Sequence, residues 1–412
     1  MESKMITGRD ILLVGLQPWD IAIGSNCKNV AAELSKYNNR ILYVNRALDR
    51  ITLLRDRKDP KTQTRLRSLR READDLQEIR PNFWTLDPRT VLESVNWIPF
   101  KTPFDILNRI NNRRMAAQIR QAIHRLGFKD VLLFIDNEFY RGLYLQELLA
   151  PEVTDCIYYS RDNLATHPFF VRQGKRLEPQ LIAKSTMVVT NSDYLEDYGR
   201  KYNPHTYNIL QGCDFERFFP EQPFTLPEEM RGIKGPIIGY MGVMTVARLD
   251  LKILEHIATQ RPDWSLVLVG PQDKTFQKSR LHQLPNVHFI ANVPEVRVPQ
   301  FIQFFDVCIN PQLVNGMTIG NYPRKLDEYM VLGKPVVVTR TLAMELFKDH
   351  VYQCDTPQDY VENITRALEE RKDPERVQGW ISFSLQHTWE VSLSKMSQHY
   401  FRLKKTQQSQ PA

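Results

Sequence analysis

Glycine and charged residues lie at two predicted strand-to-helix junctions in the second half of the chain, where they could bind a phosphorylated ligand. Gly239 and Gly242 flank the end of an apolar segment, and a glycine there lets the backbone approach a ligand without a Cβ clash. Further along, Pro323 can start a helix that carries Lys325 in its first turn and then Glu328. A helix N-terminus and a lysine attract phosphate, and a carboxylate can accept two hydrogen bonds from a diol. An ordinary tight turn and a surface lysine are the alternative interpretations.

Other polar residues follow predicted strands at points where ligands are commonly bound. Arg248 comes after the glycine turn, and its guanidinium could hold two phosphate oxygens, although a solvated arginine at a helix end is the alternative. In the first half, Gly24 lies in the loop after segment 11–15, and Arg161, Asp162 and His167 follow segment 156–160. A single loop histidine is more often structural, so we assign no proton transfer to His167.

The elements that must position these residues alternate along the whole chain. Short segments rich in Val, Ile, Leu and Tyr predict buried parallel strands at 11–15, 41–45, 131–136, 156–160, 187–190, 208–210, 237–242, 265–270, 287–291, 306–310 and 335–339. Amphipathic stretches between them predict helices, which indicates an α/β fold with doubly wound parallel sheets. A Pro- and Gly-rich segment suggests two domains, 1–225 and 226–385, followed by a helical tail at 386–412.

The composition is that of a globular protein. The chain has 412 residues, of which 42% are hydrophobic and 25% charged, and this excludes a disordered, collagen-like or coiled-coil protein. A formal net charge of +7 favours anionic partners. Five cysteines occur without C-x-x-C spacing, so neither a zinc site nor a redox dithiol is indicated. No secretory signal or membrane-spanning segment is recognised, and we expect a cytoplasmic protein.

Four segments, taken in order, resemble retaining glycosyltransferases of the GT-B fold, of the group 1 or family 4 type that acts on bacterial polysaccharides and the cell envelope. They are residues 188–220, 235–271, 284–311 and 322–339. The resemblance covers about residues 150–345, and the first 150 residues only by their architecture. It implies two Rossmann-like domains that face each other across a cleft, with a C-terminal helix packed back on the first domain. It also implies a sugar transferase whose donor is a nucleotide-diphosphate sugar.

The resemblance assigns roles to individual residues. Donor binding is implied for Gly242, Arg248, Tyr322, Lys325 and Glu328, with Glu328 on the ribose hydroxyls. Acceptor binding is implied for Gly24, Arg161 and His167, and catalysis for Asp162 and Arg248. The sequence departs from the commonest motif at Gly320, where a second glutamate normally contacts the transferred sugar. This departure puts recognition of the donor sugar in doubt, and we interpret it as a trait of a subfamily.

The cationic segments of the chain, and the motifs that it lacks, limit the kinds of partner and cofactor that we expect. Segment 46–72 contains ten Lys or Arg against four Asp or Glu, and segment 108–129 is also cationic, so either could lie on an anionic membrane at the inner face. A solvated charged surface is the alternative, and nucleic acid is not expected. The chain lacks a D-x-D pair, so we predict neither metal nor cofactor beyond the donor, which is a co-substrate. The acceptor would be a saccharide or a lipid-linked saccharide. A nucleotide-sugar epimerase and a non-catalytic binding protein are the alternative functions.

Overall fold

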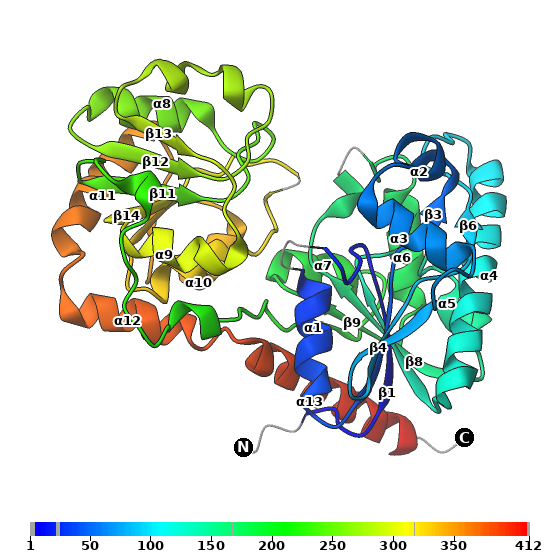
Figure 1. Cartoon of the computed structure of the whole chain (residues 1–412). Coiled ribbons are helices and arrows are strands. Elements are labelled where there is room, and N and C mark those ends of the chain that lie inside the picture. Colours follow the sequence, from blue (N-terminus) through cyan, green and yellow to red (C-terminus); the bar gives the residue numbers. More distant parts are fainter. Residues whose placement is uncertain (1–4, 22–24, 167–168, 317, 410–412) are drawn as a thin grey trace. The chain divides into compact units, whose positions relative to one another are not determined.

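The computed structural model describes residues 5–21, 25–166, 169–316 and 318–409. They form two compact units, which are described separately (Figure 1). Unit 1 is Met1–Leu210 together with Ser392–Ala412, and unit 2 is Gln211–Val391. The division comes earlier than the predicted boundary near residue 225. The reason is that the segment after Leu210 bonds into unit 2, where the Cys213 amide donates to the His387 carbonyl at 2.8 Å.

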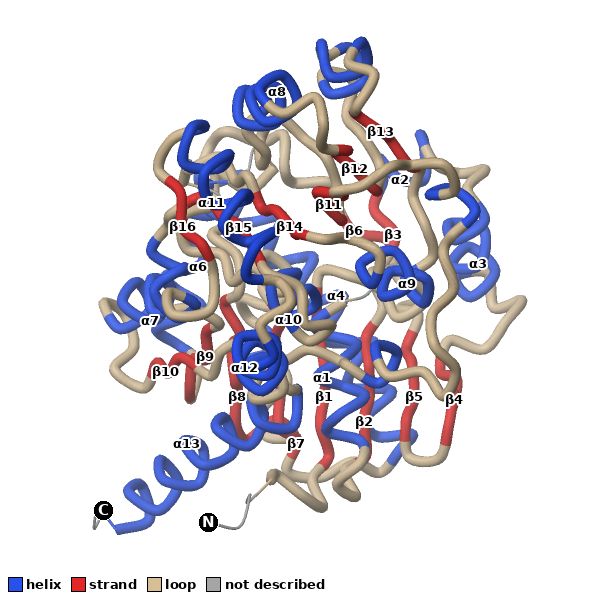
Figure 2. Tube along the Cα trace, turned by 90° about the vertical axis from the view of Figure 1, so that its left-hand side faces the viewer, coloured by secondary structure: helices blue, strands red, loops and turns tan. Residues whose placement is uncertain are grey.

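In the described residues, unit 1 contains a sheet of eight strands in the order β10-β9-β8-β7-β1-β2-β5-β4 (Figure 2). Its strands are β1 (Asp10–Gly15), β2 (Arg40–Val44), β4 (Leu76–Arg80), β5 (Phe83–Leu86), β7 (Val131–Asp136), β8 (Val153–Ser160), β9 (Met187–Thr190) and β10 (Thr206–Asn208). All neighbours are parallel except β4 and β5. Every residue of β1 and β7 is buried, as expected for central strands that are covered on both faces. A two-stranded sheet joins β3 (Leu48–Asp49) and β6 (Val91–Leu92).

Helices cover both faces of this sheet, and Figure 1 shows α1 and α4 on opposite sides. The helices that lie entirely in unit 1 are α1 (Asn26–Ser35), α2 (Arg50–Arg55), α3 (Pro60–Leu69), α4 (Lys101–Leu126), α5 (Leu145–Leu148), α6 (Gly174–Lys184) and α7 (Asp193–Arg200), with the 3₁₀ turn η1 (Leu164–Thr166). Local sequence explains their ends. Asp49 caps α2, Asp59 caps α3, and α4 stops at Gly127 in the left-handed conformation. The predicted cap of α7, Ser192, is confirmed.

The last helix, α13 (Trp389–Ser409), begins in unit 2 and continues into unit 1. Within unit 1, Tyr400 Oη and Lys404 Nζ each donate to the buried Asp155 carboxylate at 2.8 Å. The Ser397 hydroxyl accepts from the Ile6 amide at 3.1 Å. The prediction that the C-terminal helix packs on the first domain is therefore confirmed.

In its described part, unit 2 has a sheet of six parallel strands in the order β13-β12-β11-β14-β15-β16. The strands are β11 (Ile237–Met241), β12 (Ser265–Val269), β13 (Val287–Ile290), β14 (Val307–Asn310), β15 (Val336–Thr339) and β16 (Tyr352–Cys354). The helices are α8 (Leu251–Gln260), α9 (Val298–Gln303), α10 (Lys325–Met330), α11 (Pro357–Glu370) and α12 (Pro374–Ser384). Short 3₁₀ turns are η2 (Glu216–Phe218), η3 (Glu228–Met230), η4 (Phe276–Lys278), η5 (Arg280–Gln283), η6 (Glu295–Arg297) and η7 (Leu342–Phe347).

Each sheet reverses its strand order at one place, and in open α/β sheets ligands bind beyond the carboxyl ends of the strands at such a point. In unit 1 the reversal lies between β1 and β7, and in unit 2 between β11 and β14. The predicted doubly wound α/β fold is confirmed for both units. No helix in the described ranges combines the length and apolar character needed to cross a bilayer.

Candidate functional site

The glycine turn of unit 2 lies against a lysine at the sheet reversal. Gly242 follows β11 with φ +142°, and a Cβ built on it would lie 3.1 Å from Lys325 Nζ. Lys325 begins α10, and its Nζ donates to Tyr240 Oη at 2.7 Å and lies 4.2 Å from the centre of that ring. The structure thus brings Gly242 and Lys325 together, with a half-buried ammonium beside backbone that carries no side chain. Such a site can hold an anion in contact with the main chain.

The other glycine of this strand has a different role. A Cβ on Gly239 would meet the ring of Phe305 at 2.1 Å, so glycine is needed there for packing within the unit. Of these two glycines, Gly242 is the one whose backbone lies beside a charged group, the Lys325 ammonium.

Arg248 lies on the loop that follows β11, and this loop is bonded to the loop after β14. The Leu313 amide donates to the Arg248 carbonyl at 2.8 Å, and Asn315 Nδ2 donates to the Ala247 carbonyl at 2.9 Å. The Arg248 side chain is exposed, and within the described ranges it makes no hydrogen bond or ion pair, including none with Lys325 or Glu328. The two loops meet at the reversal point, and the Arg248 guanidinium is available to a ligand.

Glu328 is buried on α10 and paired with two arginines. Its Oε1 lies 3.2 Å from Arg324 Nε and 3.4 Å from Arg217 Nη2. Arg217 also pairs with Glu295 at 2.8 Å. Its second oxygen, Oε2, accepts no hydrogen bond from the described residues. The two ion pairs therefore hold the carboxylate in a fixed position, with one oxygen left to accept hydrogen bonds from a diol.

The neighbouring carboxylate, Asp327, anchors α10 from inside the unit. It is fully buried and accepts hydrogen bonds from Tyr322 Oη and His387 Nδ1, each at 2.7 Å. Burial raises the pKa of Asp327 above its usual value, while the hydrogen bond and charge of His387 oppose this rise. Tyr322, predicted to bind the donor, is itself buried, with its hydroxyl directed at Asp327.

In unit 1, the loop after β8 is organised around Arg161. Its Nε donates to Asp136 Oδ1 at 2.7 Å and its Nη1 to Asp162 Oδ2 at 2.6 Å. Burial alone would lower the pKa of Arg161, but the charges of Asp136 and Asp162 outweigh it and raise that pKa. Arg161 and Asp162 are thus brought together as an ion pair. Two predicted acceptor residues, Gly24 and His167, lie outside the described residues.

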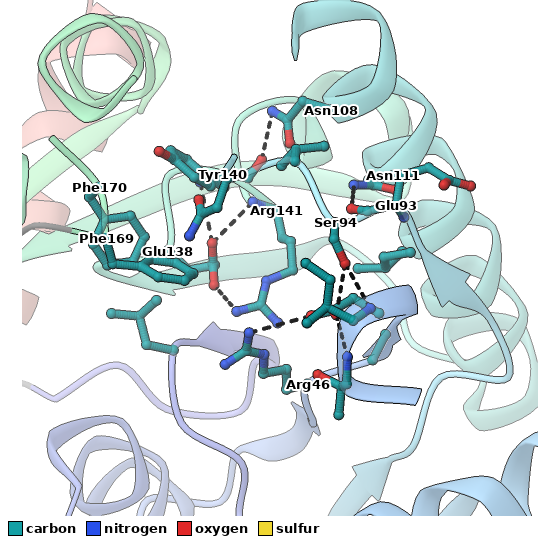
Figure 3. Close-up of a pocket in the computed structure, with 18 of the residues that line it drawn as sticks. Arg46, Glu93, Ser94, Asn108, Asn111, Glu138, Tyr140, Arg141, Phe169 and Phe170 are labelled. Carbon is teal, nitrogen blue, oxygen red and sulfur yellow. Dashed lines mark hydrogen bonds and ion pairs between the residues drawn. The ribbon is translucent and has the colours of Figure 1, made fainter. Parts of the chain in front are cut away.

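Unit 1 also contains a cavity of about 220 Å³ (Figure 3). Its lining includes residues from the segments that follow β1, β2 and β7, so it lies at the reversal point of this sheet, and α2, α4 and the segments around β6 and after β8 complete its walls. The apolar part of the lining is Leu16, Ala47, Ile51, Leu92, Val95, Tyr140, Phe169 and Phe170. The polar part is Arg46, Asp49, Thr52, Arg55, Asp56, Glu93, Ser94, Asn96, Asn108, Asn111, Glu138 and Arg141.

Sequence reasoning missed several of these residues. Arg46 was grouped with the surface charges of segment 46–72, and Asn108, Arg141 and Arg217 were not singled out. Asn108 and Arg217 bond residues distant in sequence, Tyr140 and Glu328, and no local pattern records such contacts. The position of Arg46, two residues after a buried strand, was the one available signal.

A resident metal is not indicated by side-chain clusters in the described part of the chain, where no group of three His, Cys, Asp or Glu is arranged to hold one. The expectation that no metal takes part is not tested by this observation.

Comparison with known proteins identifies similar sequences. Residues 235–370 match the family model described as glycosyl transferases group 1. The TuaH glycosyltransferase assigned to teichuronic acid biosynthesis in Bacillus subtilis strain 168 is 27% identical over 227 residues. This match covers 50% of the present chain and 56% of TuaH, so the chain matches only about half of that relative's length.

Solved structures resemble the chain over nearly its full length. Sucrose-phosphate synthase from Thermosynechococcus elongatus has a TM-score of 0.66 at 15% identity, and the match covers 97% of this chain and 100% of that one. HepE from Anabaena in complex with UDP has a TM-score of 0.64 at 15% identity, with 98% and 100% covered. HepE in complex with UDP-glucose has a TM-score of 0.60 at 16% identity, with 97% and 100% covered. At these identities the likeness shows the fold.

Proposed function

The chain carries a glycosyl transferases group 1 domain and has the GT-B fold, and from this premise we propose that it is a glycosyltransferase. It transfers a sugar from a nucleotide-diphosphate sugar to a saccharide or a lipid-linked acceptor. The observation that carries the proposal is the arrangement of Gly242, Lys325 and Glu328 at the sheet reversal of unit 2. The HepE structures that contain UDP and UDP-glucose support this class of donor. The comparisons do not favour an epimerase or a non-catalytic binding protein.

Each donor group has a suitable partner in unit 2. The ribose diol donates to the open oxygen of Glu328, and Lys325 with the bare backbone at Gly242 holds the diphosphate. Arg248 stabilises the diphosphate charge that develops as the sugar leaves. These side-chain cations are the basis for proposing transfer without a metal. We propose that the sugar keeps its anomeric configuration and that Asp162 takes part in catalysis; proton NMR of the product reports the configuration.

Donor binding is tested by calorimetric titration of the full-length protein with a panel of nucleotide sugars that includes UDP-glucose. Glu328→Gln removes the charged acceptor, so it weakens nucleoside and nucleotide binding alike by about ten- to a hundredfold. The Lys325→Met variant binds the nucleoside diphosphate more weakly than the wild type does, but binds the nucleoside equally well.

The matched controls for these variants are Glu345→Gln and Lys372→Met, which change exposed residues of the same unit. Melting temperatures without ligand show whether each variant is folded. If folded Glu328→Gln binds every nucleotide sugar as tightly as the wild type, the ribose assignment and the donor site built on it are wrong.

We further propose that unit 1 binds the acceptor and contacts an anionic membrane from the cytoplasmic side. Large apolar side chains are exposed there, with Leu54 at 86%, Phe100 at 72% and Trp97 at 64%. The segments that carry them are bonded to their neighbours: Arg172 donates to the Trp97 carbonyl at 2.8 Å, and the Ile51 amide donates to the Ser94 hydroxyl at 3.0 Å. Exposed basic residues accompany them at Arg55, Arg57, Lys58, Lys101, Arg172 and Lys175. Apolar side chains among cations are typical of surfaces that insert between anionic lipid headgroups.

A further inference from the structure

The cavity of unit 1 holds two guanidinium groups side by side. Arg46 and Arg141 lie next to each other in Figure 3. Arg141 pairs with Glu138, whereas Arg46 makes no hydrogen bond within the described ranges and has one ion pair, with Asp49 at 3.7 Å. The positive charge of Arg141, together with burial, holds the pKa of Arg46 below its usual value. The two like charges repel each other, and the nearby carboxylates of Glu138 and Asp49 offset this repulsion only in part.

Three carboxylates that line the cavity are bonded to other groups: Glu138 pairs with Arg141, and Asp49 and Glu93 are bonded as follows. Asp49 Oδ1 accepts from the Thr52 amide and the Ser94 hydroxyl, each at 2.9 Å, because it caps α2. Glu93 Oε1 accepts hydrogen bonds from Arg50 Nη2 and Arg114 Nη1, each at 3.0 Å. The hydrogen bond from Arg50 lowers the pKa of Glu93 to about 2. None of these carboxylates forms a hydrogen bond with Arg46. The Arg46 side chain is thus 46% exposed at the mouth of the cavity, where its one ion pair in the described structure, with Asp49, is long and no described carboxylate bonds it directly.

Amide groups in the same cavity also lack partners. Asn108 is 1% exposed, and its Nδ2 donates to the Tyr140 carbonyl at 3.1 Å, but its Oδ1 is buried and accepts nothing from the described residues. For Asn96, both the oxygen and the nitrogen of the amide are buried without a hydrogen bond in the same part of the chain. Buried polar groups of this kind normally have partners, and both side chains line the cavity, so a small rotation of each amide lets it bond a hydroxyl of a ligand there.

The size and walls of the cavity fit one sugar ring. A volume of about 220 Å³ is roughly seven times the share of one water molecule in the liquid, which is more than a lone ion needs. The rings of Tyr140 and Phe169 supply apolar surface beside the polar groups. A sugar presents both apolar C–H faces and hydroxyl groups.

We propose that this cavity binds an acidic sugar of the acceptor. Its carboxylate or phosphate lies on Arg46 and Arg141, and its hydroxyls bond Asn96 and Asn108. The inference rests on the proposed function, because it names the chemical class of the acceptor. The shared chemistry is an oxyanion attached to a sugar ring, and the anion relieves the repulsion between the two guanidiniums.

Three probes with the same ring separate the possible sources of the anion: glucuronate carries a carboxylate, glucose 6-phosphate carries a phosphate, and glucose carries neither. Each is titrated into the full-length protein by saturation-transfer NMR, once without nucleotide and once with UDP present. We expect at least one acidic probe to bind about tenfold or more tightly than glucose. A preference for glucuronate indicates a uronic acid, and a preference for glucose 6-phosphate indicates a phosphorylated sugar.

Variants connect the preference to the cavity. We expect Arg46→Gln to abolish the preference for the acidic probe over glucose, and Arg46→Lys to retain part of that preference. The control Arg402→Gln changes an exposed arginine of α13 and should leave the preference intact. The melting temperature of Arg46→Gln does not fall, because Arg46 forms no hydrogen bond in the described structure. Equal binding of the three probes, or an unchanged preference in Arg46→Gln, overturns the inference. Nucleotide-sugar titration of the wild type is separate, so its failure contradicts the donor site and not this one.

Discussion

Glu178 makes the stability of unit 1 depend on pH in a direction opposite to that of most carboxylates. It lies on α6 and is 1% exposed. Its Oε1 accepts from Tyr158 Oη at 2.9 Å and from Ser160 Oγ at 3.1 Å, while its Oε2 is buried without a partner among the described residues. Burial raises the pKa of Glu178 to about 7, and the two hydrogen bonds only partly oppose this rise.

The sign and size of the effect follow from proton binding. The usual pKa is 4.5 and the folded value is about 7, so the folded state holds its proton more tightly than the unfolded state. Its contribution to stability is fully present below pH 4.5 and is lost as the pH rises through 7. The whole difference corresponds to about 3 kcal/mol, of which about 2.5 kcal/mol falls between pH 5 and pH 8. Ionised Glu178 thus lowers the free energy of unfolding above neutral pH.

Glu178→Gln tests this reasoning because glutamine keeps the acceptor for Tyr158 and Ser160 but cannot ionise. We expect its stability relative to the wild type to increase by about 2.5 kcal/mol between pH 5 and pH 8. Urea denaturation followed by circular dichroism measures the difference, and the titration of all other groups cancels. Glu72→Gln, at an exposed glutamate of the same unit, should show no such trend. A difference independent of pH would show that Glu178 is not protonated in the folded protein near neutrality.

Two further predictions concern unit 2 and the surface of unit 1. Gly239→Ala should lower the melting temperature, at a cost of about 1–3 kcal/mol, because its Cβ would overlap Phe305, whereas Gly242→Ala should chiefly weaken nucleotide-sugar binding in calorimetry. Because φ +142° disfavours a side chain, Gly242→Ala also lowers the melting temperature, so the distinction lies in binding, and an equal loss of binding in both folded variants would remove it. The double variant Trp97→Ser, Phe100→Ser should sediment about tenfold less with phosphatidylglycerol vesicles than the wild type does. Wild-type protein that binds neutral phosphatidylcholine vesicles equally well would exclude the proposed role of anionic lipid.

The architecture was predictable because it follows from local patterns. Continuous apolar segments such as residues 11–15 indicate buried parallel strands. Single residues such as Ser192 indicate where a helix begins. The antiparallel strand β4 escaped prediction because Leu76–Arg80 is polar and mostly exposed. An edge strand of that kind has no periodic apolar signal.

The candidate site was predictable only in part. Gly242 and Lys325 could be proposed because each lies directly at a junction of a strand or helix, and the structure brings them together. The local sequence indicates where a residue lies along a strand or helix, but it does not indicate which way the side chain points. Tyr322 directs its hydroxyl at Asp327, and Glu328 is paired with Arg217, a residue 111 positions away. Such long-range pairs depend on how loops pack on the finished sheet.

The charged residues at the two reversal points differ in their ion pairing. This difference determines how clearly a substitution can separate a loss of ligand binding from a loss of stability. Glu328 is already paired with Arg217 and Arg324, so its removal changes ligand binding and also takes one ion pair from each of these two arginines. A loss of stability is therefore expected alongside any loss of binding. Arg46 is repelled by Arg141 and makes no hydrogen bond within the described residues, so its removal takes away a ligand contact and relieves a repulsion. Selective loss of acidic-sugar binding at unchanged stability would therefore locate that ligand in unit 1 more cleanly than substitution of Glu328 locates the donor in unit 2.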